Sequence, residues 1–212
     1  MQLYGYFRSS AAFRVRIALN LKRLSCDFAP VHLLKNEQAA PGYRSINPQG
    51  LVPALEDGGN VLTQSLAIIE YLDETYPDPP LLPDNAADRA RVRALAGVVA
   101  CDIHPIDNLR VLRYLRRPLG HDEGTIIAWF NHWIAEGFAA LERLLAGDPR
   151  TGQFCHGDSP GLADVVLVPQ IVNSERYRLD LAPYPTIARI YERCMALDPF
   201  AAAHPQHQPD RE

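Results

Sequence analysis

Cysteine is scarce in this sequence and is never paired. The four cysteines stand at positions 26, 101, 155 and 194, and no two of them have Cys-x-x-Cys or metal-ligand spacing. This spacing argues against a disulfide framework, a zinc site and a dithiol redox centre. Scattered, unpaired thiols are typical of proteins in a reducing compartment. We therefore expect a cytoplasmic protein that holds no metal.

Long apolar runs and an excess of positive charge are also missing. No hydrophobic stretch approaches membrane-spanning length, and Met1 is followed by a strand-like segment instead of the basic and apolar regions of a signal peptide. The formal net charge of −4 argues against nucleic acid as the main partner. The 212 residues, 47% of them hydrophobic, are enough for one large domain or two small ones.

The first third of the chain alternates between strand and helix patterns. Short apolar stretches predict strands, a Glu-Asp-Gly-Gly turn predicts a hairpin, and apolar residues at helical spacing predict two helices. The order is βαβ followed by ββα, which is an α/β arrangement. The predicted elements are strands at 3–6 and 28–33, a strand starting at 52, its hairpin partner from 61, and helices at 12–21 and 65–76.

A proline-rich linker separates this part from a helical remainder. Four prolines fall within residues 77–83, which marks a boundary between domains. We predict an α/β domain over 1–80 and an all-α domain over 86–212. The predicted helices span 87–117, 122–146, 162–177 and 184–196. Pro105 should bend or break the first of these, and the tail from Ala201 is expected to fray.

Polar residues lie where the first strand runs into the first helix. Arg8, Ser9 and Ser10 fill this turn. A helix N-terminus offers unpaired N–H groups and the positive end of a dipole, so two hydroxyls and a guanidinium there suit an anionic ligand. Taken alone, Ser9 and Ser10 are more simply interpreted as caps of the helix.

Two further segments are candidates for ligand binding. A cis bond between Val52 and Pro53 would present the Val52 backbone to a peptide that adds as an extra strand, whereas a trans proline at the first position of a strand is the ordinary alternative. Gln64 and Ser65 lie at the N-terminus of the next predicted helix, where they suit a carboxylate site, and Ser65 also suits a plain N-cap.

With these motifs in order, the chain resembles the zeta class of glutathione transferases over nearly its whole length. That class includes maleylacetoacetate isomerase and the bacterial maleylpyruvate isomerases. The resemblance implies a thioredoxin-like N-terminal domain, a helical C-terminal domain and a homodimer. It rests on Tyr6-Phe7-Arg8-Ser9-Ser10, Arg14-Val15-Arg16-Ile17-Ala18-Leu19, Asn47-Pro48, Val52-Pro53, the run from Gln64 to Leu72, Gly157-Asp158, Ala163-Asp164, Leu167-Val168-Pro169-Gln170, Glu175-Arg176, Asp180-Leu181 and Pro183-Tyr184-Pro185.

The resemblance also implies a role for individual residues. Ser9 would donate to the glutathione sulfur and favour its thiolate, and Arg8 and Arg176 would bind the carboxylates of the substrate. Together with Ser9 itself, the remaining residues would contact glutathione: Ser10, Arg14, Gln38, Val52, Gln64, Ser65, His104, Asn108, Leu109 and Arg110. A lone His before Pro in a bent helix is also explained by a bond to a backbone carbonyl, so His104 has an ordinary structural alternative.

The chain departs from the class at three positions. Ala11 stands where the class often has Cys, so no protein thiol is expected to act. Gly161 stands where a Ser or Thr usually caps a helix, which predicts a modest loss of stability. His104 stands where some members have Gln, which should alter a contact with glutathione and its pH response.

The implied activity is a glutathione-dependent cis-trans isomerisation of maleylacetoacetate to fumarylacetoacetate in tyrosine breakdown. Maleylpyruvate, from gentisate breakdown, is the alternative substrate. A conjugating transferase or dehalogenase on the same fold is a nearby alternative, and a non-catalytic binding module is a more distant one. A thioredoxin-type oxidoreductase is disfavoured because residues 9–14 contain no cysteine.

Overall fold

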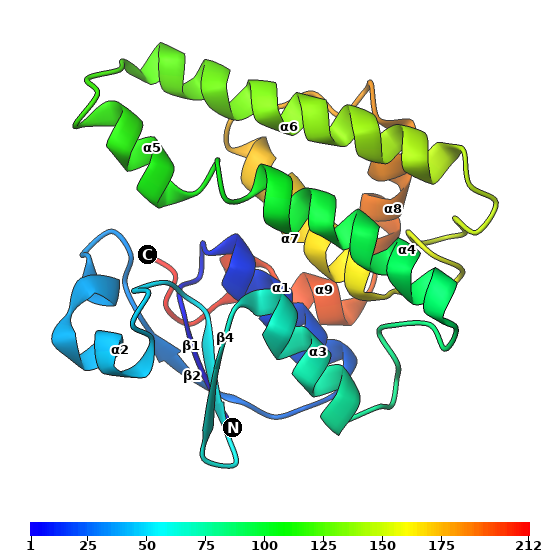
Figure 1. The fold of residues 1–212 in the computed structure, drawn as a ribbon, viewed down its shortest axis with the longest axis horizontal. Helices are drawn as coiled ribbons and strands as arrows, with labels where there is room; N and C mark the ends of the chain where they lie inside the picture. Colours follow the sequence, from blue (N-terminus) through cyan, green and yellow to red (C-terminus); the bar gives the residue numbers. More distant parts are fainter. The chain divides into compact units, whose positions relative to one another are not determined.

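The computed structural model describes residues 1–212, which form two compact units. Contacts join Met1–Leu81 with Met195–Glu212 in the first unit, and Leu82–Cys194 make up the second (Figure 1). The final segment of the chain thus groups with the N-terminal residues. The division into domains 1–80 and 86–212 remains a prediction.

A four-stranded mixed sheet forms the centre of the first unit (Figure 1). Its strand order is β2-β1-β3-β4. β1 pairs parallel with β2 and antiparallel with β3, and β3 and β4 form the hairpin that the Gly58-Gly59 turn predicts. The strands are β1 (Gln2–Gly5), β2 (Asp27–Pro30), β3 (Ala54–Asp57) and β4 (Asn60–Thr63).

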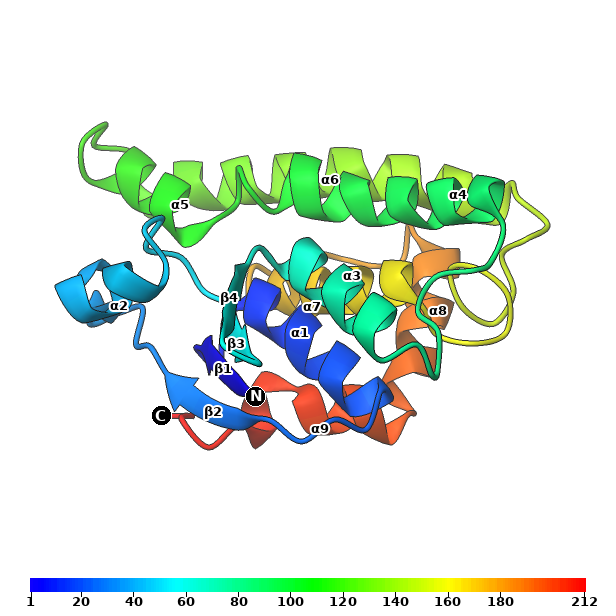
Figure 2. The same cartoon turned by 60° about the horizontal axis from the view of Figure 1, so that its bottom comes forward.

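Successive side chains along a strand point to opposite faces of the sheet, and helices pack on both of these faces. Gly5 faces α1 (Ser10–Leu21): a Cβ on Gly5 would lie 3.3 Å from the Cβ of Ala12. Tyr4 points the other way, toward Tyr43 of α2 (Pro41–Ile46), with the ring centroids 6.2 Å apart. α3 (Ser65–Thr75) packs beside α1 (Figure 2).

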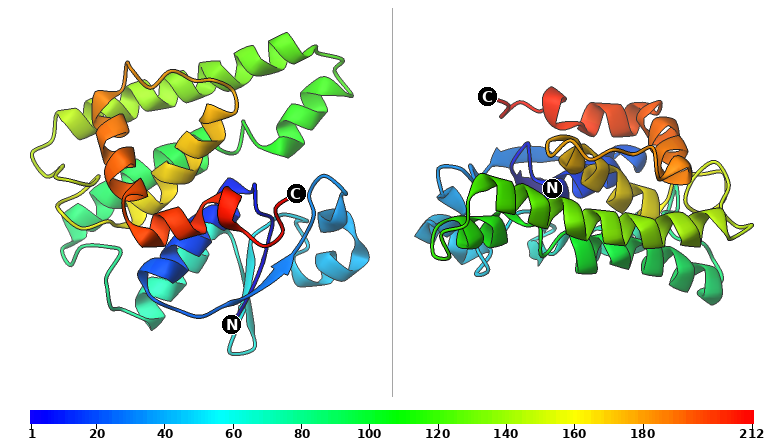
Figure 3. Two further views of the ribbon diagram at one scale, coloured as in Figure 1. Left: turned by 180° about the vertical axis from the view of Figure 1, so that it is seen from behind. Right: turned by 90° about the horizontal axis from the view of Figure 1, so that it is seen from above.

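The C-terminal segment is ordered against α1, contrary to the predicted fraying. α9 (Asp198–Ala203) packs along α1, and a 3-10 turn, Pro205–His207, follows it (Figure 3, left). The Asn20 amide donates to the Pro199 carbonyl over 2.9 Å, and the His204 ring meets the Phe13 ring edge-on. The prediction of a loose tail was wrong because Phe200 and Ala203 of α9 are buried and α9 packs against α1, contacts that the polar composition of the tail does not reveal.

A buried lysine fixes the end of the first unit. The Lys22 ammonium forms an ion pair with Asp73 at 2.8 Å and donates to the carbonyls of Tyr76 and Pro79. Its side chain is completely buried, so these partners replace its lost water shell. Lys22 therefore ties the end of α1 to the proline-rich segment that follows α3.

The second unit is helical, and its first predicted helix is broken. α4 (Ala86–Gly97) continues as a π-helical stretch, Val98–Ile103, and α5 (Leu109–Arg116) begins after Pro105. This break agrees with the effect expected of that proline. The remaining helices are α6 (Glu123–Ala146), α7 (Leu162–Glu175) and α8 (Pro185–Met195), the last of which ends at the boundary of the unit.

The start of α7 depends on one buried carboxylate. Asp164 accepts from the N–H groups of Gly161 and Cys155 at 2.9 and 2.8 Å. Burial raises the pKa of Asp164, and these two bonds act in the opposite direction. Gly161 has no side chain to complete the cap, and the Asp164 carboxylate connects the helix start to the preceding loop through Cys155.

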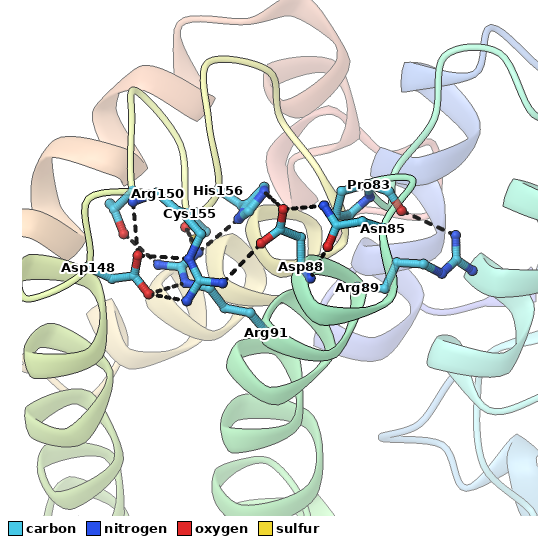
Figure 4. Close-up of polar contacts among 10 residues, drawn as sticks. Pro83, Asn85, Asp88, Arg89, Arg91, Asp148, Arg150, Cys155 and His156 are labelled. Atoms are coloured by element: carbon cyan, nitrogen blue, oxygen red, sulfur yellow. Dashed lines mark hydrogen bonds and ion pairs between the residues drawn. The ribbon is translucent and has the colours of Figure 1, made fainter.

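Arg91 joins α4 to the loop that follows α6 (Figure 4). Its guanidinium pairs with Asp148 at 2.9 Å and donates to the Cys155 carbonyl and the Thr151 hydroxyl at 2.8 and 2.7 Å. Arg150 makes a second pair with Asp148 and holds its pKa well below the usual range. One arginine thus anchors a loop that has no regular structure of its own.

No helix in the structure combines the length and the hydrophobicity that crossing a membrane requires.

Candidate glutathione site

The loop between β1 and α1 is a tight turn that ends in a capping serine. The Ser9 N–H donates to the Tyr6 carbonyl at 2.9 Å, and the Ser9 hydroxyl accepts from the Ala12 N–H at 3.2 Å. The capping role that the sequence suggested is therefore realised. It does not consume the hydroxyl proton, because a serine oxygen can accept one bond while its O–H donates another. Ser9 remains able to donate to a ligand.

Ser9's neighbours differ in exposure. Arg8 is exposed to solvent, whereas Ser10, the first residue of α1, is 7% exposed. The guanidinium is thus available to a charged ligand, and the backbone around Ser10 belongs to the packed start of the helix.

Arg14 and Ser65 meet inside the first unit. Arg14, one turn beyond Ser10 on α1, is 2% exposed, and its Nη1 donates to the Ser65 hydroxyl at 3.3 Å. A buried cation at the start of α3 adds to the positive end of the helix dipole. The pair gives this helix start the electrostatic character that a bound carboxylate needs.

Gln64 adopts a backbone conformation that the sequence did not reveal. It has φ +70 and is the N-cap of α3, so Ser65 is the first helical residue and the N-cap alternative for Ser65 is wrong. The Gln64 amide donates to the Gln49 side chain at 2.8 Å. Gln49 was not among the predicted site residues, and its only sequence signal is its place in the Asn47-Pro48 turn.

Gln38 lies beside the loop that contains Gln49. It belongs to a 3-10 turn, Glu37–Ala39, and its amide donates to Asn36 at 2.9 Å. Its side-chain oxygen is buried without a hydrogen-bond partner. Gly50 has φ +63, and a Cβ there would lie 2.9 Å from the Gln38 carbonyl, so only glycine lets the two segments come this close.

The Val52-Pro53 bond is cis, and Val52 precedes the paired part of β3. The carbonyl of Leu51, just before it, accepts from the Tyr43 hydroxyl at 2.6 Å and from the Asn47 amide at 2.7 Å. Burial raises the pKa of Tyr43 to about 12, so this donor keeps its proton at physiological pH. The backbone leading to Val52 is therefore held from two sides.

These residues of the first unit are suited to a small acidic peptide that contains a thiol. Ser9 has a hydroxyl proton to give, Ser65 stands at a helix start beside a buried cation, and Gln38 has a buried amide oxygen without a partner. Hydroxyl, guanidinium and backbone donors are what a thiolate and a carboxylate require. The donors at Ser9, Arg14 and Ser65 suit the thiolate and carboxylate of glutathione, and the Gln38 oxygen can accept from one of its N–H groups.

The predicted residues of the second unit cluster around the start of α5. The amide of Asn108, its N-cap, lies 3.4 Å from the His104 ring nitrogen, and its oxygen accepts from the Arg110 N–H at 3.1 Å. Leu109 is the first residue of the helix, and the Arg110 side chain is exposed. His104 and Asn108 are thus brought together as neighbours.

Asp107, between them, was missed by the sequence reasoning. It is 4% exposed, neither carboxyl oxygen has a hydrogen-bond partner, and burial raises its pKa to about 8. Nothing in its sequence context distinguishes it from a surface acid. Only the packing of this segment, where the Trp129 indole donates to the Ile106 carbonyl, reveals its burial.

Arg176 follows the last turn of α7. It is exposed, and its Nη1 lies 3.5 Å from the Asn173 side-chain oxygen. The next residue, Tyr177, stacks on Phe130 of α6 with 3.7 Å between the ring centroids. The stacked ring fixes the backbone beside Arg176 and leaves its guanidinium at the surface.

Family models match both parts of the chain. Residues 3–80 match the glutathione S-transferase N-terminal domain, and residues 134–193 match the glutathione S-transferase C-terminal domain. The chain belongs to the glutathione S-transferase family.

Full-length relatives narrow this assignment. A maleylpyruvate isomerase from a Ralstonia species is 51% identical over 210 residues, which cover 99% of each chain. A solved maleylpyruvate isomerase, described as a bacterial glutathione S-transferase of the zeta class, covers 100% of both chains with a TM-score of 0.98 and 51% identity. A Methylobacterium extorquens maleylacetoacetate isomerase, solved with malonate and glutathione, has a TM-score of 0.97, 44% identity and full coverage. The resemblance to the zeta class, and the fold it implied, are confirmed.

Proposed function

We propose that this protein is a glutathione-dependent cis-trans isomerase that converts maleylacetoacetate to fumarylacetoacetate. The observation that carries the proposal is similarity over the full chain to isomerases of maleyl keto acids, one of them solved with glutathione. Retention of Ser9, Val52-Pro53 and Gln64-Ser65 in the first unit supports catalysis over a purely structural use of the fold.

In this proposal, residues of the first unit make the main contacts with glutathione, and four residues of the second unit add to them. Ser9 donates to the sulfur and lowers its pKa, and Val52 pairs with the cysteinyl backbone. Gln64 and Ser65, with Arg14 behind them, hold the γ-glutamyl carboxylate. The remaining contacts are assigned to Ser10, Gln38, His104, Asn108, Leu109 and Arg110.

When bound, glutathione supplies a thiolate that adds to the alkene, allows rotation about the resulting single bond, and leaves again. The protein's task is to stabilise negative charge that moves onto the conjugated carbonyl. Arg8 and Arg176 bind the substrate carboxylates and supply positive charge that favours this state over the neutral ketone. Because the thiol is regenerated, glutathione acts as a cofactor and total thiol stays constant.

Maleylpyruvate is the second candidate substrate. It is favoured by the 51% identity to a maleylpyruvate isomerase over the whole chain. The two substrates share the maleyl group and differ at the keto end, away from the reacting alkene, so one pocket can accept both. Conjugation or dehalogenation of small electrophiles is proposed as a side activity.

We also propose a cytoplasmic homodimer. The unpaired cysteines support a reducing compartment, and membership of the family supports the dimer. Light scattering of the purified protein measures its mass directly against the 23.6 kDa of one chain.

Replacement of Arg176 by alanine tests the substrate part of the proposal. The variant is expected to lose on the order of 100-fold in kcat/KM for a maleyl keto acid, since a bidentate carboxylate contact is lost. Arg193→Ala, at another exposed arginine of the same unit, is the control and keeps full activity. If Arg176→Ala leaves both KM and kcat unchanged, Arg176 does not bind the substrate.

A further inference from the structure

The turn that carries Ser9 is held by two charged side chains from other segments of the chain, Arg16 and Asp210. Phe7 is the second residue of this turn, between Tyr6 and Ser9. Its N–H donates to the Asp210 carboxylate at 2.9 Å, and its carbonyl accepts from the Arg16 guanidinium at 3.1 Å. Both polar groups of one backbone residue are therefore fixed by side chains, one 9 and the other 203 residues away in the sequence.

Arg16 forms the inner half of this clamp. It lies on α1, is 6% exposed, and its guanidinium stands 5.3 Å from the Phe13 ring centroid. Its Nε also donates to the Ala203 carbonyl at the end of α9, at 3.1 Å. One buried side chain therefore connects the turn, the first helix and the C-terminal segment.

Asp210 forms the outer half. Burial lowers the pKa of Arg16 to about 10, and the negative charge of Asp210 acts in the opposite direction, toward the charged guanidinium. The segment around Asp210 is folded back on itself by the Gln208 amide, which donates to the carbonyls of Ala202 and His204. The C-terminal end of the chain thus returns to the turn after passing along α1 (Figure 3, left), and the Asp210 carboxylate accepts from the Phe7 N–H.

We propose that Arg16 and Asp210 are positioning residues for Ser9, so that the C-terminal segment keeps the thiol-binding hydroxyl in place. A turn of four residues has few backbone torsions, and pinning both polar groups of Phe7 restricts most of them. Ser9 is then preorganised before a ligand arrives, and the entropy of ordering the turn is not lost on binding. This inference rests on the proposed role of Ser9 toward glutathione.

The test compares Asp210→Ala with Arg211→Ala. Arg211 is the exposed neighbour of Asp210, and its side chain donates only to the Gln206 carbonyl within the same coil. Asp210→Asn is the conservative variant: its amide oxygen can still accept from Phe7, although the charge beside Arg16 is lost. Circular dichroism and thermal unfolding establish that each variant is folded.

Two readouts are measured on each protein. Amide hydrogen exchange, without glutathione, follows the Phe7 N–H directly. Ultraviolet absorbance of the thiolate, titrated against pH in the binary complex, gives the pKa of bound glutathione. Asp210→Ala is expected to speed exchange at Phe7 at least about 10-fold and to raise the thiol pKa by roughly one unit, while Arg211→Ala matches the parent. Asp210→Asn should fall between the two.

Different variants test the positioning role of Asp210 and the proposed role of Ser9 toward glutathione. If Asp210→Ala matches Arg211→Ala in either readout, the positioning role is wrong. If Ser9→Ala binds glutathione with the same thiol pKa as the parent, the proposed role of Ser9 itself fails, and exchange at Phe7 still reports whether the clamp exists.

Discussion

Arg14 donates to the hydroxyl of Ser65 over 3.3 Å, with the guanidinium almost completely buried between α1 and α3. The contact joins two residues that are 51 positions apart, each of which the family resemblance had implied as a separate contact with glutathione. It explains how a helix start with a single hydroxyl can be built for a carboxylate: the positive charge is supplied from the neighbouring helix.

Removal of that hydroxyl should weaken glutathione binding. Ser65→Ala loses one hydrogen bond to a charged group and leaves Arg14 with one acceptor fewer, so we expect about a 10-fold rise in the Kd for glutathione. Isothermal titration calorimetry gives the value. Ser45→Ala, at an exposed hydroxyl that bonds only to the Gly42 carbonyl, is the control. Equal affinity of both variants would exclude Ser65 from the site.

Ser9 should affect the chemistry more than the stability. Ser9→Ala removes the proposed donor to the sulfur and is expected to lower kcat/KM on the order of 100-fold. It also removes the cap on Ala12, at a cost of about 1 kcal/mol in the free energy of unfolding. Ser9→Thr keeps the hydroxyl and should retain most of the activity. A Ser9→Ala enzyme with parental kcat/KM would show that the hydroxyl only caps the helix.

Asp107 should make the protein less stable as pH rises. Its pKa is near 8 in the folded protein, whereas that of an aspartate in an unfolded chain is about 3.9. Between these values the unfolded chain releases the proton and the folded protein keeps it, so the contribution of this residue to the free energy of unfolding falls from about pH 4 to about pH 8. Below pH 4 it is constant.

Asp107→Asn tests this directly because the amide cannot ionise. Urea unfolding of parent and variant is measured at several pH values between about 5 and 8. The free energy of unfolding of the variant should rise relative to that of the parent as pH rises. The neighbouring Asp102→Asn, at an exposed residue of the same segment, serves as the control. A constant difference between parent and Asp107→Asn across this range would mean that Asp107 is ionised throughout.

Arg91 should contribute to stability in the second unit. Its replacement by alanine removes one of the two arginines that pair with Asp148 and also removes the guanidinium donor to the Cys155 carbonyl, and we expect a loss of about 2 to 3 kcal/mol in the free energy of unfolding. Arg89→Ala removes a single 3.4 Å contact with Pro83 and should cost little. Chemical denaturation compares the two. Equal stability of Arg91→Ala and Arg89→Ala would mean that the loop after α6 does not depend on Arg91 for its structure.

Local pattern was sufficient for most of the fold. The apolar stretch at 3–6, the Gly58-Gly59 turn and the proline break at 105 all act over a few residues, so the sequence displays them directly. The segments that the pattern mispredicted depend on distant partners. The C-terminal coil is folded by α1, and Ser65 follows the helix cap because Gln64 takes a positive φ.

The site divides in the same way. Residues that motifs mark, such as Ser9 and Ser65, were found from the sequence, although their catalytic and binding roles remain predictions. Gln49, Asp107 and Asp210 were not found, because their importance arises from burial and from contacts made only after folding. A carboxylate that clamps a turn 203 residues away leaves no local signal.

The central claim is glutathione-dependent isomerisation, and one absorbance assay tests it most directly. Purified protein is mixed with maleylacetoacetate or maleylpyruvate, with and without glutathione, and free thiol is measured before and after. The account predicts conversion to the fumaryl product only when glutathione is present, with total thiol unchanged, and the faster substrate identifies the preferred keto acid. Failure to convert either substrate by a protein that binds glutathione would contradict it and favour a conjugating or dehalogenating transferase.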